Sequence, residues 1–286
     1  MPLVTMSELL EMNKDENWAI GAVDVMNQDM VRGVIAGAEK VNAPVILMLA
    51  EIHEPLVSIE ELGAIMVDAA ERSTVPVCVH FDHGESYDSI IRAMRAGFTS
   101  VMYDGSPLPF EENIRKTQEI VKVAKALGVS VEAELGQLTR PEGCDDEEIE
   151  ENPDLYTDPD QADRFYKKTG IDALAVAFGT AHGVYAKQPI LDFDRLKRID
   201  ELTNAPLVMH GGSGLEAKDF QTAIDCGVKK INYYSNMVYN VALTIKKKLN
   251  EAEDKVYYPD ISVWTIEAIR DDIAETLTLF RSNGKA

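Results

Sequence analysis

Residues 75 to 84 read VPVCVHFDHG, a short apolar run that ends in two of the chain's five histidines and a carboxylate. A run of this length, rich in apolar and β-branched residues, is typical of a strand buried on both faces in a parallel sheet. Polar side chains at the end of such a strand lie at the edge where parallel α/β folds build their binding sites. The stretch therefore indicates a parallel α/β fold with a functional site at this strand end.

Runs of the same kind recur along the chain, and segments with helical periodicity lie between them. The eight runs cover residues 18–23, 43–49, 75–81, 98–103, 129–135, 172–178, 205–210 and 228–234. Eight βα repeats in 286 residues predict one (β/α)8 barrel, a TIM barrel, with a single domain over residues 1–286. A doubly wound open sheet is the alternative, but no glycine-rich dinucleotide motif follows the first run.

Three other segments complete this organisation. Residues 136 to 158 form a long, acidic connection without clear periodicity, which is typical of a functional lid or of a disordered segment. Residues 235 to 251 are expected to form the last helix of the barrel. Residues 261 to 283 are amphipathic and predict an extra C-terminal helix.

Composition limits the kind of partner. The formal net charge of −21 repels nucleic acid and anionic membrane surfaces, so we expect neither as a partner. No apolar run is long enough to span a membrane, and the first residues lack the pattern of a signal peptide. The three cysteines, Cys78, Cys144 and Cys226, are widely spaced, which suits a reducing compartment and predicts the cytoplasm.

Histidines gather at the ends of the predicted strands, where a barrel places its active site. His83, His182 and His210 follow three different strands, so their rings can converge on one divalent ion. Three protein ligands with an open position are the pattern of a catalytic zinc. A lone histidine at a strand end is more often structural, and we expect a supporting role for His80, which shares the facing of Asp82.

Two glycine- and serine-containing segments follow the seventh and eighth strands. They read HGGSG, residues 210 to 214, and NYYSN, residues 232 to 236, and each opens a predicted helix. Backbone N–H groups at helix N-termini bind anions, and barrels commonly hold phosphate at this place. GGSG alone is as well explained by a flexible turn, but its position beside His210 favours a phosphate site within an otherwise acidic protein.

With these residues assembled, the chain resembles the class II, zinc-dependent ketose-bisphosphate aldolases, which include the fructose- and tagatose-bisphosphate aldolases. The resemblance extends from about residue 5 to the end and is most specific in VPVCVHFDHG, SVMYDGSPLPFEENI, VSVEAELG, YTDPDQADRFYKKTGIDALAVAFGTAHGVY, APLVMHGGSGL and CGVKKINYYSNM. It implies a lyase of carbohydrate metabolism, as in glycolysis. Such an enzyme cleaves the C3–C4 bond of a ketose phosphate and releases dihydroxyacetone phosphate.

The resemblance also implies roles for individual residues. His83, His182 and His210 would hold the zinc ion, and Asp82 would exchange a proton with the C4 hydroxyl of the substrate. The chemistry agrees, because cleavage leaves negative charge on an enediolate, which a Lewis acid stabilises, and needs a base at the C4 hydroxyl. A second base, for dihydroxyacetone phosphate, is expected among the carboxylates of residues 142 to 151.

Further positions match the family around this centre. Asp104 and Glu134 match carboxylates that hold a displaced or second ion in some relatives. The residues that match positions around the phosphate and hydroxyls are Gly183, Gly211, Gly212, Ser213, Asn232 and Ser235. Relatives also bind a monovalent cation here, Na+ or K+, and assemble as homodimers or homotetramers. We expect the C-terminal helix of this chain to make such a contact.

The chain departs from the family on the side that holds the acceptor aldehyde. Asp24 replaces a neutral amide, Glu51 and His53 replace small polar residues, and DKVYYPDIS at 254–262 lacks the usual arginine for a second phosphate. Carboxylates repel a phosphate dianion, so we expect an acceptor that need not be phosphorylated.

Three alternatives to an aldolase with an unphosphorylated acceptor stay open. One is a true fructose- or tagatose-1,6-bisphosphate aldolase, in which Lys255, Arg270 or Arg281 supplies the missing charge. Another is a non-catalytic barrel that binds sugar phosphate, which fold alone does not exclude. A zinc hydrolase is the third, but the first strand lacks the His-x-His that we would expect of one.

Overall fold

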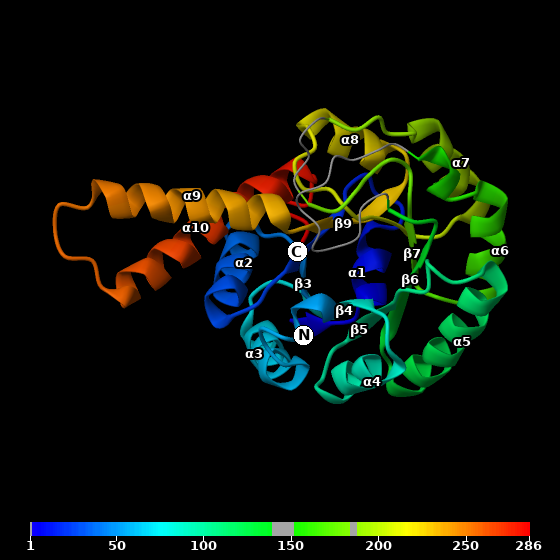
Figure 1. The fold of residues 1–286 in the computed structure, drawn as a ribbon, viewed down its shortest axis with the longest axis horizontal. Helices are drawn as coiled ribbons and strands as arrows, with labels where there is room; N and C mark the ends of the chain where they lie inside the picture. The colour runs from blue at the N-terminus through cyan, green and yellow to red at the C-terminus, as the bar shows by residue number, and fades with distance from the viewer. Residues whose placement is uncertain (1, 139–151, 184–187) are drawn as a thin grey trace.

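The computed structural model describes residues 2–138, 152–183 and 188–286. Eight parallel strands close into a barrel, β2 pairing with β9 and β4 with β5 (Figure 1). The barrel strands are β2 (Ile20–Asp24), β3 (Val45–Ala50), β4 (Val77–Gly84), β5 (Ser100–Tyr103), β6 (Ser130–Leu135), β7 (Ala173–Val176), β8 (Leu207–Met209) and β9 (Val228–Tyr233). They coincide with the eight predicted runs, so the predicted TIM barrel is confirmed.

Helices cover the outside of the barrel between successive strands. They are α2 (Gln28–Val41), α3 (Ile59–Arg72), α4 (Tyr87–Arg95), α5 (Phe110–Leu127), α6 (Pro159–Thr169), α7 (Phe193–Thr203) and α8 (Ala217–Asp225), with 3-10 turns η1 (Glu51–His53) and η2 (Pro153–Leu155). Polar caps fix many of the ends; for example, the Asn27 side chain accepts from the Met30 N–H at the start of α2. Within the described residues, no helix is long and apolar enough to cross a bilayer.

The alternating facing of β4 explains why a core strand carries polar groups. Val79 and Phe81 face the helices and belong to the large apolar core between sheet and helices. Cys78, His80 and Asp82 face the barrel interior, and all three are at most 1% exposed. The interior is apolar towards the N-terminal ends of the strands and polar towards their C-terminal ends, which places the site at the C-terminal mouth.

A short strand and a helix, both outside the eight predicted repeats, close the other end of the barrel. β1 (Leu3–Val4) pairs with the start of β4, and α1 (Met6–Asn13) begins with a capping box made by Thr5 and Glu8. Apolar residues of α1 pack with interior residues of the barrel strands. The C-terminal mouth is therefore the end from which a substrate reaches the interior.

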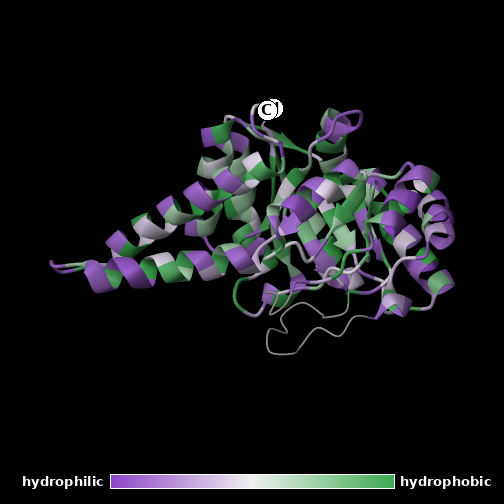
Figure 2. Cartoon of the chain, turned by 90° about the horizontal axis from the view of Figure 1, so that it is seen from above, coloured by the Kyte–Doolittle hydropathy of each residue, from purple (hydrophilic) through white to green (hydrophobic). Residues whose placement is uncertain are grey.

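The last two helices are arranged differently from the expectation. α9 (Ser235–Glu251) does not complete the helix layer but projects from the barrel, and α10 (Tyr258–Leu279) returns beside it (Figures 1 and 2). Gly33 and Gly37 of α2 let α10 approach closely, at Ile269 and Ile273. The predicted extra C-terminal helix is thus present, but its second half covers the barrel, and α9 and the first half of α10 form an arm.

Candidate functional site

Three histidines from three parts of the chain meet at the C-terminal mouth of the barrel. His83 ends β4, His210 follows β8, and His182 lies in the connection after β7. One nitrogen atom of each ring lies within 4.8 Å of the others, and His83 Nε2 is 3.0 Å from His210 Nδ1. The structure therefore brings together the three predicted metal ligands.

Hydrogen bonds behind two of these rings determine which nitrogens face each other. His83 Nδ1 is 3.0 Å from Asp104 Oδ2, and His210 Nε2 is 2.8 Å from Glu132 Oε1. Burial opposes the ionisation of both carboxyls. Hydrogen bonds outweigh burial at Asp104 and hold its pKa well below its usual range. Neighbouring positive charge and a hydrogen bond outweigh it at Glu132, whose pKa falls to about 2. Ionised carboxylates only accept, so each ring donates to its carboxylate. When both rings are neutral, each turns an unprotonated nitrogen towards the other. Two lone pairs that face each other fit a divalent cation.

The charge state of the histidines agrees with this fit. Burial lowers the pKa of His210 and, together with the nearby His83 and His210, lowers that of His182 well below its usual range. Neutral imidazole is the form that binds a metal. Three such nitrogens are the usual protein ligands of a catalytic zinc.

A local distortion of β4 delivers His83 to this group. Its φ of 45° lies in the left-handed region, which non-glycine residues rarely adopt, and the pairing with β5 shifts register between Phe81 and Gly84. A Cβ on Gly84 would lie 2.6 Å from the Met102 carbonyl oxygen, so this position needs glycine. The bulge lets the neighbouring Asp82 and His83 both reach the mouth.

Asp82 lies beside the histidines and is 1% exposed. Its Oδ2 accepts from Asn232 Nδ2 at 3.1 Å, and its Oδ1 is 3.4 Å from His80 Nε2. Burial would raise its pKa, but the neighbouring His83 and the contact with His80 outweigh burial and hold that pKa well below its usual range. Asp82 is therefore an ionised carboxylate that can accept a proton. His80, for which a supporting role is predicted, contacts it through Nε2, and its Nδ1 is 2.7 Å from Ser100 Oγ.

A cavity of about 200 Å³ next to Asp82 collects the residues predicted to bind phosphate. Its lining includes Gly183, Gly211, Gly212, Ser213, Asn232 and Ser235. Gly211 has a φ of 66°, and a Cβ there would collide with the backbone of Ala181, so only glycine lets the chain pass. Ser235 is the first residue of α9, whose N-terminus supplies unpaired N–H groups of the kind that bind anions.

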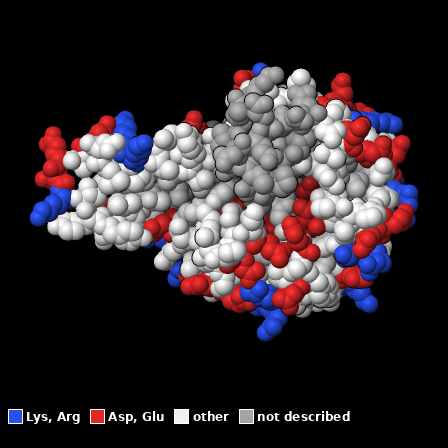
Figure 3. All heavy atoms as spheres, viewed as in Figure 1, with Lys and Arg blue, Asp and Glu red and all other residues white. Residues whose placement is uncertain are grey.

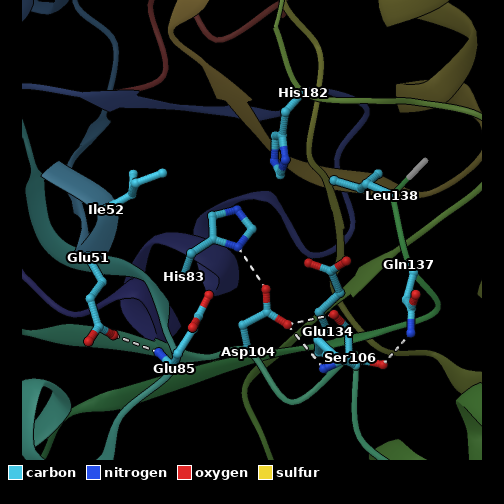
Figure 4. A pocket seen from close by; sticks show the side chains of 11 residues that line it. Glu51, Ile52, His83, Glu85, Asp104, Ser106, Glu134, Gln137, Leu138 and His182 are labelled. Carbon is cyan, nitrogen blue, oxygen red and sulfur yellow. Dashed lines mark hydrogen bonds and ion pairs between the residues drawn. The ribbon is translucent and has the colours of Figure 1, made fainter. Parts of the chain in front are cut away.

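A second cavity, of about 380 Å³, lies on the other side of His182, which lines both (Figure 4). Four carboxylates line it, those of Glu51, Glu85, Asp104 and Glu134. Burial and the nearby Asp104 raise the pKa of Glu134 well above its usual range. His83, Asp104 and Glu134 form another group with the spacing of a metal site, as predicted for an alternate or second ion.

The three residues predicted for the acceptor side divide between the two cavities. Asp24, 3% exposed, and His53 line the first cavity together with Asp82. Glu51 lines the second and accepts from the Glu85 N–H at 2.6 Å. Figure 3 shows acidic side chains around the hollow at the mouth of the barrel.

The described residues that line the two cavities include no lysine or arginine that could offset the charge of the carboxylates. Arg270 pairs with Asp271 and Arg281 with Asp225, and neither arginine lines a cavity. Lys255 is exposed in the turn between α9 and α10. The expected second base among residues 142 to 151 lies outside the described residues.

Two residues of the site had no predicted role. Glu132 and Lys230 are fully buried inside the barrel, with Lys230 Nζ 2.9 Å from Glu132 Oε2. The alternation of a strand contained the signal, because Lys230 lies two residues before Asn232 and therefore shares its inward facing.

Comparisons with known proteins agree with this geometry. A model of the class-II fructose-bisphosphate aldolase family matches residues 4–285. The YdjI protein of Escherichia coli K12 is 38% identical over 272 residues, 95% of each chain, and a fructose-bisphosphate aldolase of Staphylococcus aureus is 36% identical over the whole of both chains.

Solved structures show the same similarity. The crystal structure of the YdjI aldolase matches with a TM-score of 0.88 and 36% identity, covering 99% of both chains. That of fructose-bisphosphate aldolase from Campylobacter jejuni matches with a TM-score of 0.82 and 25% identity, covering 99% of this chain and 97% of the other.

Proposed function

The chain belongs to the class II fructose-bisphosphate aldolase family and is an aldolase. We propose that it uses zinc to cleave and form the C3–C4 bond of a ketose phosphate, with dihydroxyacetone phosphate as one of the two products of cleavage. The observation that carries the proposal is the convergence of His83, His182 and His210 beside Asp82 at the edge of the glycine-lined cavity. We further propose a place in carbohydrate metabolism such as glycolysis, in the cytoplasm, where the free thiols of Cys78 and Cys226 are stable.

Each group has a chemical task in this proposal. A zinc ion held by the three histidines would supply a Lewis acid for the negative charge that develops on the substrate oxygens. Asp82 takes the proton of the C4 hydroxyl when the bond breaks, and Asn232 holds it in place through the 3.1 Å hydrogen bond. The N–H groups around Gly211 and Ser235 hold the phosphate, with a monovalent cation beside it as in relatives.

Two assays on the zinc-loaded protein test this function. We expect retro-aldol cleavage of a ketose 1-phosphate, and exchange of a C3 hydrogen of dihydroxyacetone phosphate with deuterium from the solvent. A protein that binds one zinc ion but shows neither reaction would be a sugar-phosphate-binding barrel.

The acceptor aldehyde, we propose, carries no second phosphate. The second cavity, separate from the glycine-lined phosphate cavity, is lined by Glu51, Glu85, Asp104 and Glu134, with no lysine or arginine among its described residues. A phosphate dianion there would meet carboxylates without a bidentate partner. A neutral, hydroxylated aldehyde avoids this repulsion.

A substrate panel tests the acceptor. We expect kcat/KM for ketose 1-phosphates to exceed that for fructose 1,6-bisphosphate by about tenfold or more, because one unfavourable contact of about 1.4 kcal/mol is a factor of ten. The Glu51→Gln variant should narrow the difference between the two kcat/KM values, since it removes one carboxylate of the second cavity and keeps the shape of the side chain. A wild-type preference for the bisphosphate would contradict the proposal.

The protein, we propose, forms at least a homodimer through its arm. The exposed arm carries large apolar side chains, among them Tyr239, Leu243 and Val263, which are 56%, 47% and 52% exposed. Figure 3 shows few charged side chains along the visible face of the arm, except near its tip. A projecting helix pair with such a face is stabilised when a second copy covers it.

The Leu243→Glu variant is expected to weaken the dimer by about 100-fold or more, because each interface would lose two buried leucines, worth about 1.5 to 3 kcal/mol each. Sedimentation velocity over a range of concentrations measures this change. The matched control is Leu127→Glu, a similarly exposed leucine at the end of α5, 60% exposed, which should leave assembly unchanged. A wild-type monomer at high micromolar concentration would contradict the proposal.

A further inference from the structure

A lysine is buried inside the barrel directly beneath the proposed zinc and proton-transfer groups. Lys230, on β9, is 0% exposed. Its Nζ is 2.9 Å from Glu132 Oε2 and donates to Asn232 Oδ1 at 2.7 Å. A buried ammonium group needs such partners. One of the two, Glu132, contacts the proposed metal ligand His210, and the other, Asn232, contacts the proposed base Asp82.

The contact with Glu132 affects a proposed metal ligand. Lys230 only donates, so the Oε2 atom of Glu132 is occupied by the ammonium group. The other oxygen, Oε1, accepts from His210 Nε2 at 2.8 Å. Because Nε2 carries the hydrogen of this bond, the Nδ1 atom of His210 is left to face His83.

The contact with Asn232 affects the proposed base. An amide has one accepting and one donating end, and Lys230 occupies the accepting oxygen of Asn232. The Nδ2 group of Asn232 is thereby turned to Asp82, where it donates to Oδ2 at 3.1 Å. A flipped amide would present its oxygen to a carboxylate and repel it.

We propose that Lys230 is a positioning residue that orients both His210, through Glu132, and Asp82, through Asn232. This inference rests on the proposed zinc-dependent aldolase function. It assigns a role to Lys230 and Glu132, which are not among the proposed zinc ligands or proton-transfer groups. Replacing a buried ion pair by apolar groups often leaves stability unchanged or higher, which favours a role in orientation over one in stability.

The test compares two neighbouring lysines. Lys229 carries the same charge one residue earlier, but its Nζ donates to the carbonyl oxygens of Asn13 and Glu16, at the closed end of the barrel. For Lys230→Met we expect zinc to bind about 10- to 100-fold more weakly in competition with a chromogenic chelator, as for other residues behind metal ligands. With zinc at saturation, kcat for retro-aldol cleavage should still fall by about tenfold or more. Lys229→Met should change neither value by more than about twofold.

A double variant separates the effect on His210 from the effect on Asp82, and it covers the case in which Lys230→Met does not fold. In Lys230→Met with Glu132→Gln, no uncompensated charge is buried, and the glutamine oxygen can still accept from His210 Nε2. Zinc affinity should then return to within about threefold of wild type, whereas retro-aldol kcat at saturating zinc should stay low, because Asn232 has lost its donor.

Two results would overturn the inference. One is a folded Lys230→Met protein with the zinc affinity and the retro-aldol kcat of wild type. The other is a double variant that recovers both values, which would make Lys230 only the counter-charge of Glu132. Failure of the proposed function is recognised separately, because the wild-type protein would then bind no zinc or show no turnover.

Discussion

The His83→Ala variant is expected to lose its zinc on dialysis and to lower retro-aldol turnover by about 10³-fold or more. His83 is one of only three nitrogen ligands that the described residues bring together, and its loss leaves two. A Lewis acid contributes several kcal/mol to such a reaction, and each 1.36 kcal/mol is a factor of ten in rate. Metal analysis after dialysis and a coupled cleavage assay measure the two effects.

A second histidine variant serves as the control for zinc content. His53 lines the same cavity but is not part of the three-histidine group, so His53→Ala should retain one zinc ion per chain. Full zinc content in His83→Ala would instead place the ion elsewhere. The group of His80, Asp82 and Glu132, which has the spacing of a metal site and does not include His83, would then be the first to examine.

For Asp82→Asn we expect retro-aldol kcat to fall by about 10²- to 10⁴-fold, the usual contribution of a general base. The amide keeps the size of the side chain but cannot take the C4 hydroxyl proton. Zinc content should be unchanged, and exchange of the C3 hydrogen of dihydroxyacetone phosphate should persist, because a different base performs that step. Comparing the two reactions on the same sample isolates the role of Asp82.

Asp172→Asn is the matched control for this variant. Asp172 Oδ2 accepts from the Val131 N–H at 2.7 Å, near the start of β6, and an asparagine oxygen can accept the same bond. Its kcat should stay within about twofold of wild type. Wild-type retro-aldol turnover in Asp82→Asn would assign the proton transfer to another group.

The strands and the mouth of the barrel were predictable because both follow from local rules. Each barrel strand is an apolar run, and the carboxyl ends of parallel strands share one edge, so residues as distant as His83 and His210 could be placed together. In the structure, His83 Nε2 lies 3.0 Å from His210 Nδ1. Likewise, the phosphate-binding set was predicted as a group and lines one cavity.

Other features depend on packing that the sequence does not express locally. The amphipathic pattern of residues 235 to 251 fits a helix on the barrel as well as a helix in an arm. In the structure α10, rather than α9, makes the close contact with Gly33 and Gly37 of the barrel helix α2. The inward facing of Lys230 follows from alternation, but its partner Glu132 is three strands away around the barrel, on β6. Which side chains meet across the interior depends on how the closed sheet is staggered.

The left-handed conformation of His83 has a consequence for protein engineering. An ideal strand sends successive side chains to opposite faces, so it cannot present an acid and a neighbouring histidine to one reaction centre. Here the shifted pairing between Phe81 and Gly84 removes that restriction. A designer who copies Asp82 and His83 onto a regular strand of another barrel would therefore transfer the residues without the site. The irregular backbone has to be transplanted with them.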